Sequence, residues 1–171
     1  MSQVGGVRGN AEFLEGRTGG KIGPCGEYNR HVSVRLIDFE EVLSNAYVVT
    51  TLYRIHPRET RSPDVVMGIN GIPVVVGEAK TPIRPSISWL DGAHEVHDIY
   101  ENAVPQLFVP NILSFATEGK ELYYGAVRCP LEFWAPWRLE NDEDAIAKRL
   151  GLGEVGKELS DLLNPERLLD I

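Results

Sequence analysis

The sequence of 171 residues has little cysteine and no long apolar run. Its two cysteines, Cys25 and Cys129, are far apart and have no nearby cysteine or histidine at metal-ligand spacing. This pattern argues against a disulfide framework and against a structural zinc site. No apolar run approaches membrane-spanning length, and the N-terminus lacks a basic segment followed by an apolar one. We therefore expect a cytoplasmic protein without a membrane partner.

Positive charge is also scarce. The 17 lysines and arginines are outnumbered by 25 aspartates and glutamates, for a net charge of -8, so we expect weak DNA affinity from the chain alone. The charge is uneven, because residues 54–84 have a small basic excess and residues 140–171 an acidic one. Arg58, Arg61 and Arg84 in the basic stretch are candidate contacts to a DNA backbone, although solvated loop arginines are the commoner case.

Composition and the positions of glycine and proline divide the chain into three parts. Hydrophobic residues make up 43% and charged residues 25%, which suits one soluble domain with a core. The glycine-rich residues 1–30 predict an irregular lead-in, residues 31–138 the main domain, and residues 139–171 an acidic, helical docking or linker segment. Residues 16–22 superficially resemble a phosphate-binding loop, but their spacing is wrong and no strand precedes them, so we expect no ATP motor in this chain.

The chain is organised around residues 61–81. Two valine-rich runs flank Asn70-Gly71, which is the strongest short hairpin signal that a sequence carries. Residues 64–69 and 72–79 are therefore predicted to form neighbouring antiparallel strands.

The register of this hairpin decides which charged side chains meet. A two-residue turn would place Asp64 and Glu78 on opposite faces of the sheet. A three-residue loop over 69–71, with Gly71 left-handed, pairs residue 68 with 72 and places Asp64, Glu78 and Lys80 on one face. We predict the second register.

On one face, these three side chains would make a metal site beside a cation. Asp64 and Glu78 are hard oxygen ligands suited to magnesium or manganese, which favours phosphate as the bound group. Lys80 could orient or deprotonate a metal-bound water and offset developing charge. The alternative is a strand-end salt bridge, which is common and weak. The valines and isoleucines around Glu78 indicate a covered strand, where charges without a purpose are costly.

The same residues resemble a known family. Pro63-Asp64, the hairpin and Glu78-Ala79-Lys80 resemble the PD-(D/E)xK nuclease motif. Asn70-Gly71-Ile72-Pro73 followed by three valines is similar to the N-terminal domain of the R subunit of type I restriction enzymes. Further motifs follow in the family's order, within a resemblance that covers roughly residues 11–138: Leu36–Phe39, Asn45–Val49, Pro105–Phe108, Asn111, Phe115–Gly119 and Tyr124-Gly125.

The resemblance implies an α/β, restriction-endonuclease-like fold, with a mixed central sheet flanked by helices, over residues 31–138. It implies a type I site-specific deoxyribonuclease that uses Mg2+, with Mn2+ able to substitute. Asp64 and Glu78 would bind the metal and Lys80 would be the catalytic lysine. The implied partners are double-stranded DNA, modification and specificity subunits, and a helicase or translocase motor that alone would use ATP. The alternative is a catalytically inactive nuclease-like module with a structural or subunit-contact role.

A helix is predicted from Ser86 or Ser88 to about residue 102, with an apolar face that includes Val96 and Tyr100. The family usually carries a glutamine four residues before a tyrosine on this helix, and Val96 stands at that position here. We predict Tyr100 and His97 as supporting residues of the site. Such nucleases also commonly add an acid from an initial helix, for which four candidates stay open: Glu12, Glu15, Glu40 and Glu41.

Overall fold

The computed structural model describes residues 34–54, 62–81, 83, 86–139 and 149–170 of the chain. The chain divides into two compact units, Met1–Glu40 and Glu41–Ile171. In the described part of the first unit, Arg35 forms an ion pair with Asp38 at 2.5 Å. The lead-in predicted over residues 1–30 lies outside the described residues.

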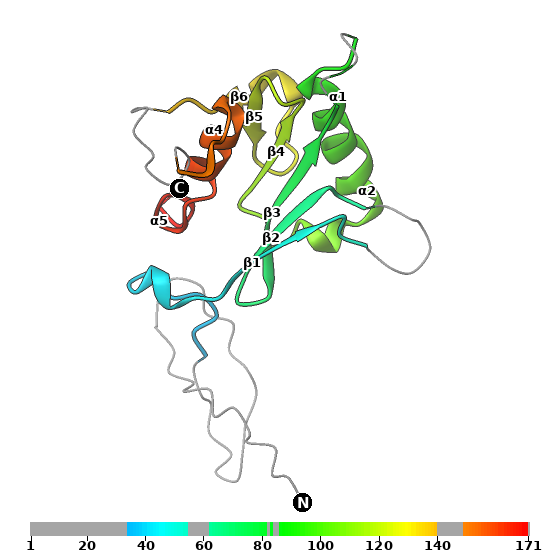
Figure 1. Ribbon diagram of the computed structural model, residues 1–171. Coiled ribbons are helices and arrows are strands. Elements are labelled where there is room, and N and C mark those ends of the chain that lie inside the picture. The colour runs from blue at the N-terminus through cyan, green and yellow to red at the C-terminus, as the bar shows by residue number, and fades with distance from the viewer. Residues whose placement is uncertain (1–33, 55–61, 82, 84–85, 140–148, 171) are drawn as a thin grey trace, which may run out of the picture. The chain divides into compact units, whose positions relative to one another are not determined.

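The second unit is built on one six-stranded sheet, in which the strands follow one another in chain order (Figure 1). Every neighbouring pair is antiparallel except β3 and β4, which run parallel. The prediction of a mixed central sheet is therefore confirmed. The strands are β1 (Tyr47–Thr51), β2 (Val65–Ile69), β3 (Ile72–Ala79), β4 (Leu113–Thr117), β5 (Leu122–Gly125) and β6 (Ala135–Pro136).

A continuous helical run crosses from β3 to β4. It consists of α1 (Trp89–His94), the π-helical segment η2 (Glu95–Tyr100) and α2 (Glu101–Ala103). Ser88 caps the run, because its hydroxyl accepts from the N–H of Leu90 while its own N–H donates to Asp91 at 2.8 Å. This capping box starts the helix at one of the two predicted serines. A crossover of this kind is what a parallel strand pair requires.

The helical run packs on one face of the sheet through an apolar cluster. Val66 and Val76 from the strands meet Ala93, Val96 and Tyr100 from the helices in this cluster. The described part of this unit also contains three shorter helical turns: η1 (Val42–Ser44), η3 (Pro105–Leu107) and η4 (Leu131–Phe133).

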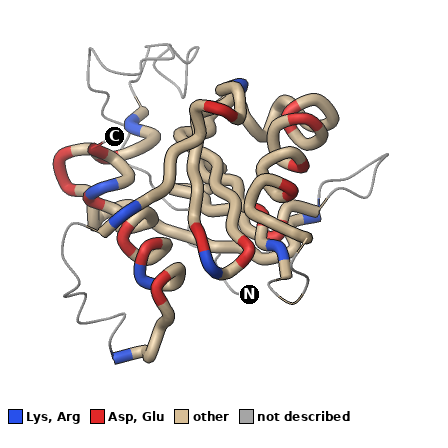
Figure 2. The backbone as a smooth tube through the Cα atoms, turned by 90° about the horizontal axis from the view of Figure 1, so that it is seen from above, with Lys and Arg blue, Asp and Glu red and all other residues tan. Residues whose placement is uncertain are grey.

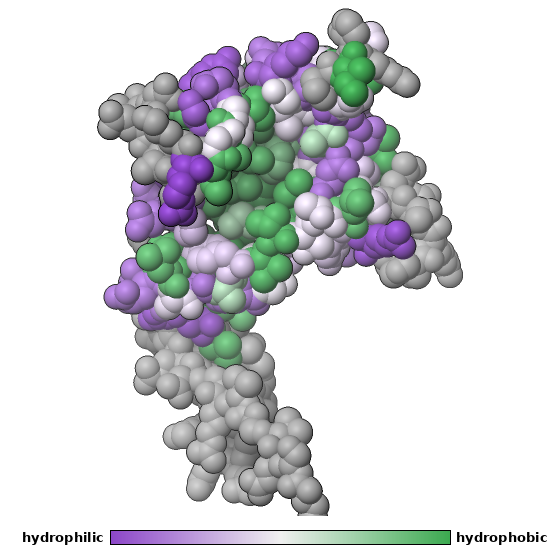
Figure 3. Space-filling view, in the orientation of Figure 1, coloured by the Kyte–Doolittle hydropathy of each residue, from purple (hydrophilic) through white to green (hydrophobic). Residues whose placement is uncertain are grey.

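The C-terminal helices α4 (Glu154–Leu162) and α5 (Pro165–Leu168) lie on the other side of the sheet (Figure 1). The indole N–H of Trp137 donates to Asp161 at 2.9 Å, and Leu162 and Leu168 are fully buried. These helices belong to the segment predicted over residues 139–171, and α4 contacts β5 while α5 contacts η1. Figure 3 shows a largely apolar hollow on this face. None of the helices among the described residues is long and apolar enough to cross a membrane.

The hairpin register differs from the predicted one. Ile69 pairs with Ile72 across a two-residue turn, in which Asn70 (φ +52°) and Gly71 (φ +83°) are both left-handed. The left-handed Gly71 is as predicted, but the three-residue loop over 69–71 is wrong. Two positive φ values define a type I′ turn, whose twist matches that of the strands.

An irregularity farther along the hairpin restores the predicted facing. Gly68 pairs with Pro73 but Met67 pairs with Val75, so Val74 is an extra residue in β3. Pro73 has no N–H to donate to the ladder, and prolines inside sheets are commonly found at such bulges. The bulge shifts the pairing by one residue and brings Asp64 and Glu78 to the same face, as predicted.

Gly77 in β3 has no room for a side chain. A Cβ there would lie 2.1 Å from the ring of Phe115 in the neighbouring strand, and Phe115 is only 1% exposed. The phenylalanine ring therefore covers the strand on the face opposite Glu78.

We expect Gly77→Ala to lower the free energy of unfolding by about 1–3 kcal/mol, since an overpacked core must distort. Gly68→Ala in the adjacent strand is the matched control, because its Cβ would meet nothing closer than 3.4 Å. We expect that control to stay within about 0.5 kcal/mol of the parent. Urea unfolding followed by circular dichroism measures both variants, and equal stability of the two would refute the packing of Phe115 on Gly77.

Candidate functional site

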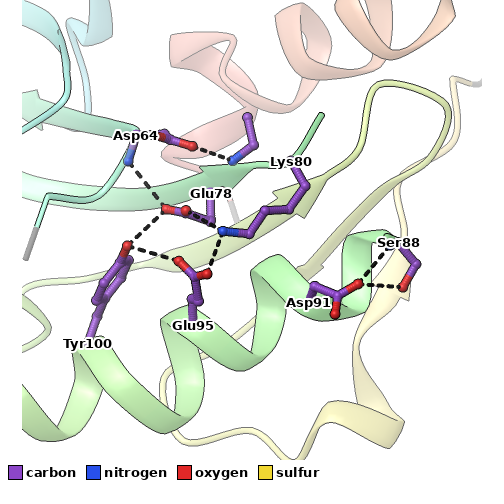
Figure 4. A network of polar contacts seen from close by, with 8 residues as sticks. Asp64, Glu78, Lys80, Ser88, Asp91, Glu95 and Tyr100 are labelled. Atoms are coloured by element: carbon purple, nitrogen blue, oxygen red, sulfur yellow. Dashed lines mark hydrogen bonds and ion pairs between the residues drawn. The ribbon is translucent and has the colours of Figure 1, made fainter. Parts of the chain in front are cut away.

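The three charged residues predicted from the hairpin meet at one end of β2 and β3 (Figure 4). Asp64 precedes β2, Glu78 lies in β3 and Lys80 follows it. The Lys80 Nζ lies 2.8 Å from Oε1 of Glu78. The backbone N–H of Asp64 donates to Oε2 of Glu78 at 3.4 Å, and the N–H of Ala79 donates to Oδ2 of Asp64 at 3.0 Å. The two strands therefore hold each other's carboxylates through backbone donors.

Helix α1 buries the glutamate. Glu78 is only 4% exposed. A Cβ at Gly92 would lie 3.3 Å from that of Ala116 and 3.5 Å from Cβ and Cγ of Glu78. The glycine thus lets the helix backbone approach the stem of the glutamate closely. This close approach keeps water away from the Glu78 carboxylate, which already points from β3 toward the helix.

The helical run adds two further polar groups to the site. The hydroxyl of Tyr100, predicted as a supporting residue, donates to Oε2 of Glu78 at 3.2 Å. It also lies 3.3 Å from Oε2 of Glu95, whose Oε1 is 2.6 Å from the Nζ of Lys80. Four side chains, those of Glu78, Lys80, Glu95 and Tyr100, therefore form one connected network (Figure 4).

Glu95 is the residue that the sequence analysis missed. Val96, at the position where the family carries glutamine, is fully buried in the apolar cluster. The side chain that reaches Tyr100 comes from one residue earlier, because the π-helical segment starts at Glu95. In a π-helix the bonding runs from i to i+5, so residues five apart come together. The only signal in the sequence was an acidic residue, Glu95, one position before the place where the family carries glutamine.

The electrostatics of the network are dominated by burial. Burial raises the pKa of Glu78 to about 7, with Glu95 and Asp64 adding to the increase and Lys80 opposing it. For Lys80, burial lowers the pKa, but its bonds to Glu78 and Glu95 outweigh that effect and the net shift is upward. Burial also raises the pKa of Glu95, yet Lys80 and its other partners hold it below the ordinary value. Lys80 therefore stays an ammonium, and Glu78 carries the under-compensated charge.

The other predicted residues lie elsewhere. The Nδ1 of His97 is 2.7 Å from Asp98, which His94 also contacts at 2.6 Å, and neither histidine has a recorded contact with Glu78 or Lys80 among the described residues. Glu41 precedes η1 and so lies toward the hairpin turn, since Tyr47 of β1 pairs with Ile69. Glu40 belongs to the other unit. The remaining candidates fall outside the described residues: Arg58, Arg61, Arg84, Glu12 and Glu15.

The chemistry of the site fits a divalent cation. Asp64 and Glu78 present hard carboxylate oxygens from adjacent strands, which Mg2+ and Mn2+ prefer. Burial, with smaller contributions from Glu95 and Asp64, raises the pKa of Glu78 to about 7 despite the nearby Lys80 ammonium. In the part of the chain that the structure describes, no three acidic, histidine or cysteine side chains converge closely enough to hold a metal by themselves. The fit therefore rests on the pair Asp64 and Glu78.

Comparison with known proteins gives a consistent set of relatives. Residues 9–133 match the family described as "Type I restriction enzyme R protein N terminus". The chain is 30% identical over 139 residues to the type I restriction enzyme HindI endonuclease subunit of Haemophilus influenzae. It is 29% identical over 116 residues to the putative type I restriction enzyme MjaIXP endonuclease subunit of Methanocaldococcus jannaschii. These alignments cover 80% and 65% of this chain but only 13% and 11% of the relatives.

The raised pKa of Glu78 makes stability depend on pH in a predictable direction. Between its ordinary value of 4.5 and about 7, the folded chain binds more protons than the unfolded chain, so stability falls as the pH rises. Glu78→Gln stays neutral and removes this fall. We expect the variant, free of metal, to match the parent near pH 4.5 and to exceed its stability by about 2 kcal/mol at pH 8. Urea unfolding in the presence of a chelator measures the difference, and a constant difference across this range would contradict the burial of the charge.

Proposed function

Since the chain belongs to the family of type I restriction enzyme R protein N termini, we propose that it is the magnesium-dependent endonuclease domain of such an enzyme. In this proposal the domain acts in the cytoplasm and hydrolyses phosphodiester bonds of double-stranded DNA. The observation that carries the proposal is the buried Glu78, which faces Asp64 and pairs with Lys80 at 2.8 Å. The names of the relatives, which are endonuclease subunits, support the same activity.

The residues divide the chemistry among them. A divalent ion held by Asp64 and Glu78 would supply Lewis acidity toward a phosphate oxygen and a bound water of lowered pKa. The Lys80 ammonium would orient the attacking water, or offset the charge that develops on the phosphate. Tyr100 fixes one oxygen of Glu78 through its hydroxyl. Because α1 covers Glu78, these groups act in a site with little competing water.

Binding of DNA needs more than this site. The net charge of -8 opposes the phosphate backbone, and the helical run from α1 to α2 contains four acids and no lysine or arginine (Figure 2). We propose that Arg58, Arg61 and Arg84 contribute backbone contacts. Most of the DNA affinity would come from a motor domain, which alone would use ATP, and from modification and specificity subunits. The chain spans only 13% of the Haemophilus relative's length.

We expect the chain to bind Mn2+ in calorimetry and Asp64→Ala to lower that affinity at least about tenfold, since the variant removes a direct ligand. Asp98→Ala is the matched control, because Asp98 lies on η2 and pairs only with His94 and His97 in the recorded contacts of the described residues. Its affinity should equal that of the parent. A parent chain that binds no Mn2+ would overturn the metal site and favour the structural or subunit-contact role.

Cleavage is the second test. With Mg2+ and plasmid DNA, we expect Lys80→Ala to lower the rate of nicking by about 10²–10³, the range for losing one donor that stabilises charge in the transition state. Lys120→Ala, in the exposed turn between β4 and β5, should nick DNA at the rate of the parent. Circular dichroism confirms the fold of each variant. Equal nicking by the parent and Lys80→Ala would remove Lys80 from the mechanism.

A further inference from the structure

We propose that Glu95 is a positioning residue, which holds the Lys80 ammonium in place against Glu78. This inference rests on the proposed nuclease function for its meaning, because it assigns a second partner to the lysine of that site. The residue lies outside the hairpin that carries Asp64, Glu78 and Lys80, and it enters the site only through the helical run.

The contacts of Lys80 are shared between two structural elements. Its Nζ lies 2.8 Å from Oε1 of Glu78, two residues away along the same chain segment. It lies 2.6 Å from Oε1 of Glu95, which comes from the helix. The lysine side chain is 18% exposed, so both contacts form where water competes weakly. Each carboxylate restrains the ammonium from a different side.

The orientation of Glu95 is itself fixed. Its Oε2 lies 3.3 Å from the hydroxyl of Tyr100, whose single proton it shares with Oε2 of Glu78 at 3.2 Å. One hydroxyl thus joins the Oε2 atoms of the two glutamates, and one ammonium joins their Oε1 atoms. Oε1 of Glu95 therefore has Lys80 as its donor, and Oε2 shares the Tyr100 proton. This arrangement suits a carboxylate that orients another side chain.

The π-helical segment is what delivers the glutamate. The N–H of Glu101 donates to the carbonyl of Val96, five residues earlier. In a regular α-helix, residues five apart lie on different faces, whereas residues three and four apart are neighbours. The wider π turn allows Glu95 and Tyr100 to reach Glu78 together. Such single π turns often occur at functional sites.

The charge of Glu95 matters most when Glu78 has a second positive partner. A divalent ion held by Glu78 would repel the nearby ammonium, so the contact with Glu78 would then restrain Lys80 less. Glu95 is the other carboxylate in contact with Nζ among the described residues. It keeps the ammonium beside the site. Without it, the flexible lysine stem is free to turn toward solvent.

Amine acylation followed by mass spectrometry tests this restraint directly. We expect Glu95→Ala to raise the acylation rate of Lys80 about fivefold, the loss of one ion pair, relative to the exposed Lys120 in the same sample. Glu95→Gln, which keeps a hydrogen-bond acceptor but no charge, should give an intermediate rate without metal. With Mn2+ present its rate should approach that of Glu95→Ala. Asp98→Ala on the same helix is the matched control and should leave the rate unchanged. Unchanged acylation of Lys80 in Glu95→Ala would overturn the proposal.

Calorimetry and single-turnover cleavage complete the test. We expect Glu95→Ala to keep the Mn2+ affinity within about threefold of the parent, since Glu95 is not a ligand, while its cleavage rate constant falls about 10²-fold without a change in DNA affinity. Glu95→Gln should recover part of that rate. A loss of Mn2+ binding as large as that of Asp64→Ala would make Glu95 a ligand and overturn the proposal. The metal-free acylation rate needs neither metal nor cleavage, so failure of the restraint is distinguishable from a parent that binds no Mn2+.

Discussion

Burial of the Glu78 carboxylate is the constraint on which the rest of the site depends. A charge that is 4% exposed is costly unless donors or counter-charges surround it. Lys80 comes from the end of β3, the N–H of Asp64 from the residue before β2, and the hydroxyl of Tyr100 from the helical run. Burial nevertheless raises the pKa of Glu78 to about 7, so the charged form is disfavoured even with these partners. In the proposed nuclease, a divalent cation would supply the remaining counter-charge.

The topology of the sheet creates this burial. Because β3 and β4 are parallel, the chain between them must cross over the sheet, and a helix is the usual connection. The crossover lies above Glu78, where Gly92 allows close approach. On the opposite face Phe115 fills the space over Gly77. The strand that carries Glu78 is therefore covered on both sides. Gly92 sets how closely the helix packs on one face, and Gly77 sets how closely Phe115 packs on the other.

The sequence predicted the parts of this site that depend on local signals. Asn70-Gly71 located the hairpin, valine content indicated a covered β3, and two candidate capping residues, Ser86 and Ser88, bracketed the helix start. The register was wrong because the bulge lies beside Pro73, three residues beyond the turn, and several registers satisfy the same alternation of side chains. Glu95 was missed because a π turn shifts the face of a helix by one residue, and no local residue type marks it. Both errors concern irregularities of one residue, which only tertiary packing decides.

The charge around the site differs in sign from the charge counted along the neighbouring sequence. Counted along the chain, residues 54–84 have a small basic excess, but the structure packs an acidic helical run against β3, and Glu95 enters the site from that run. Asp64, Glu78 and Glu95 then stand against one ammonium, and an unscreened cluster of this kind repels a phosphate. In the proposed nuclease, the carboxylates therefore couple DNA to the cation, because phosphate approaches favourably only when the cation offsets their charge. In this proposal, the site's own composition as well as the overall net charge would weaken the DNA affinity of the metal-free chain.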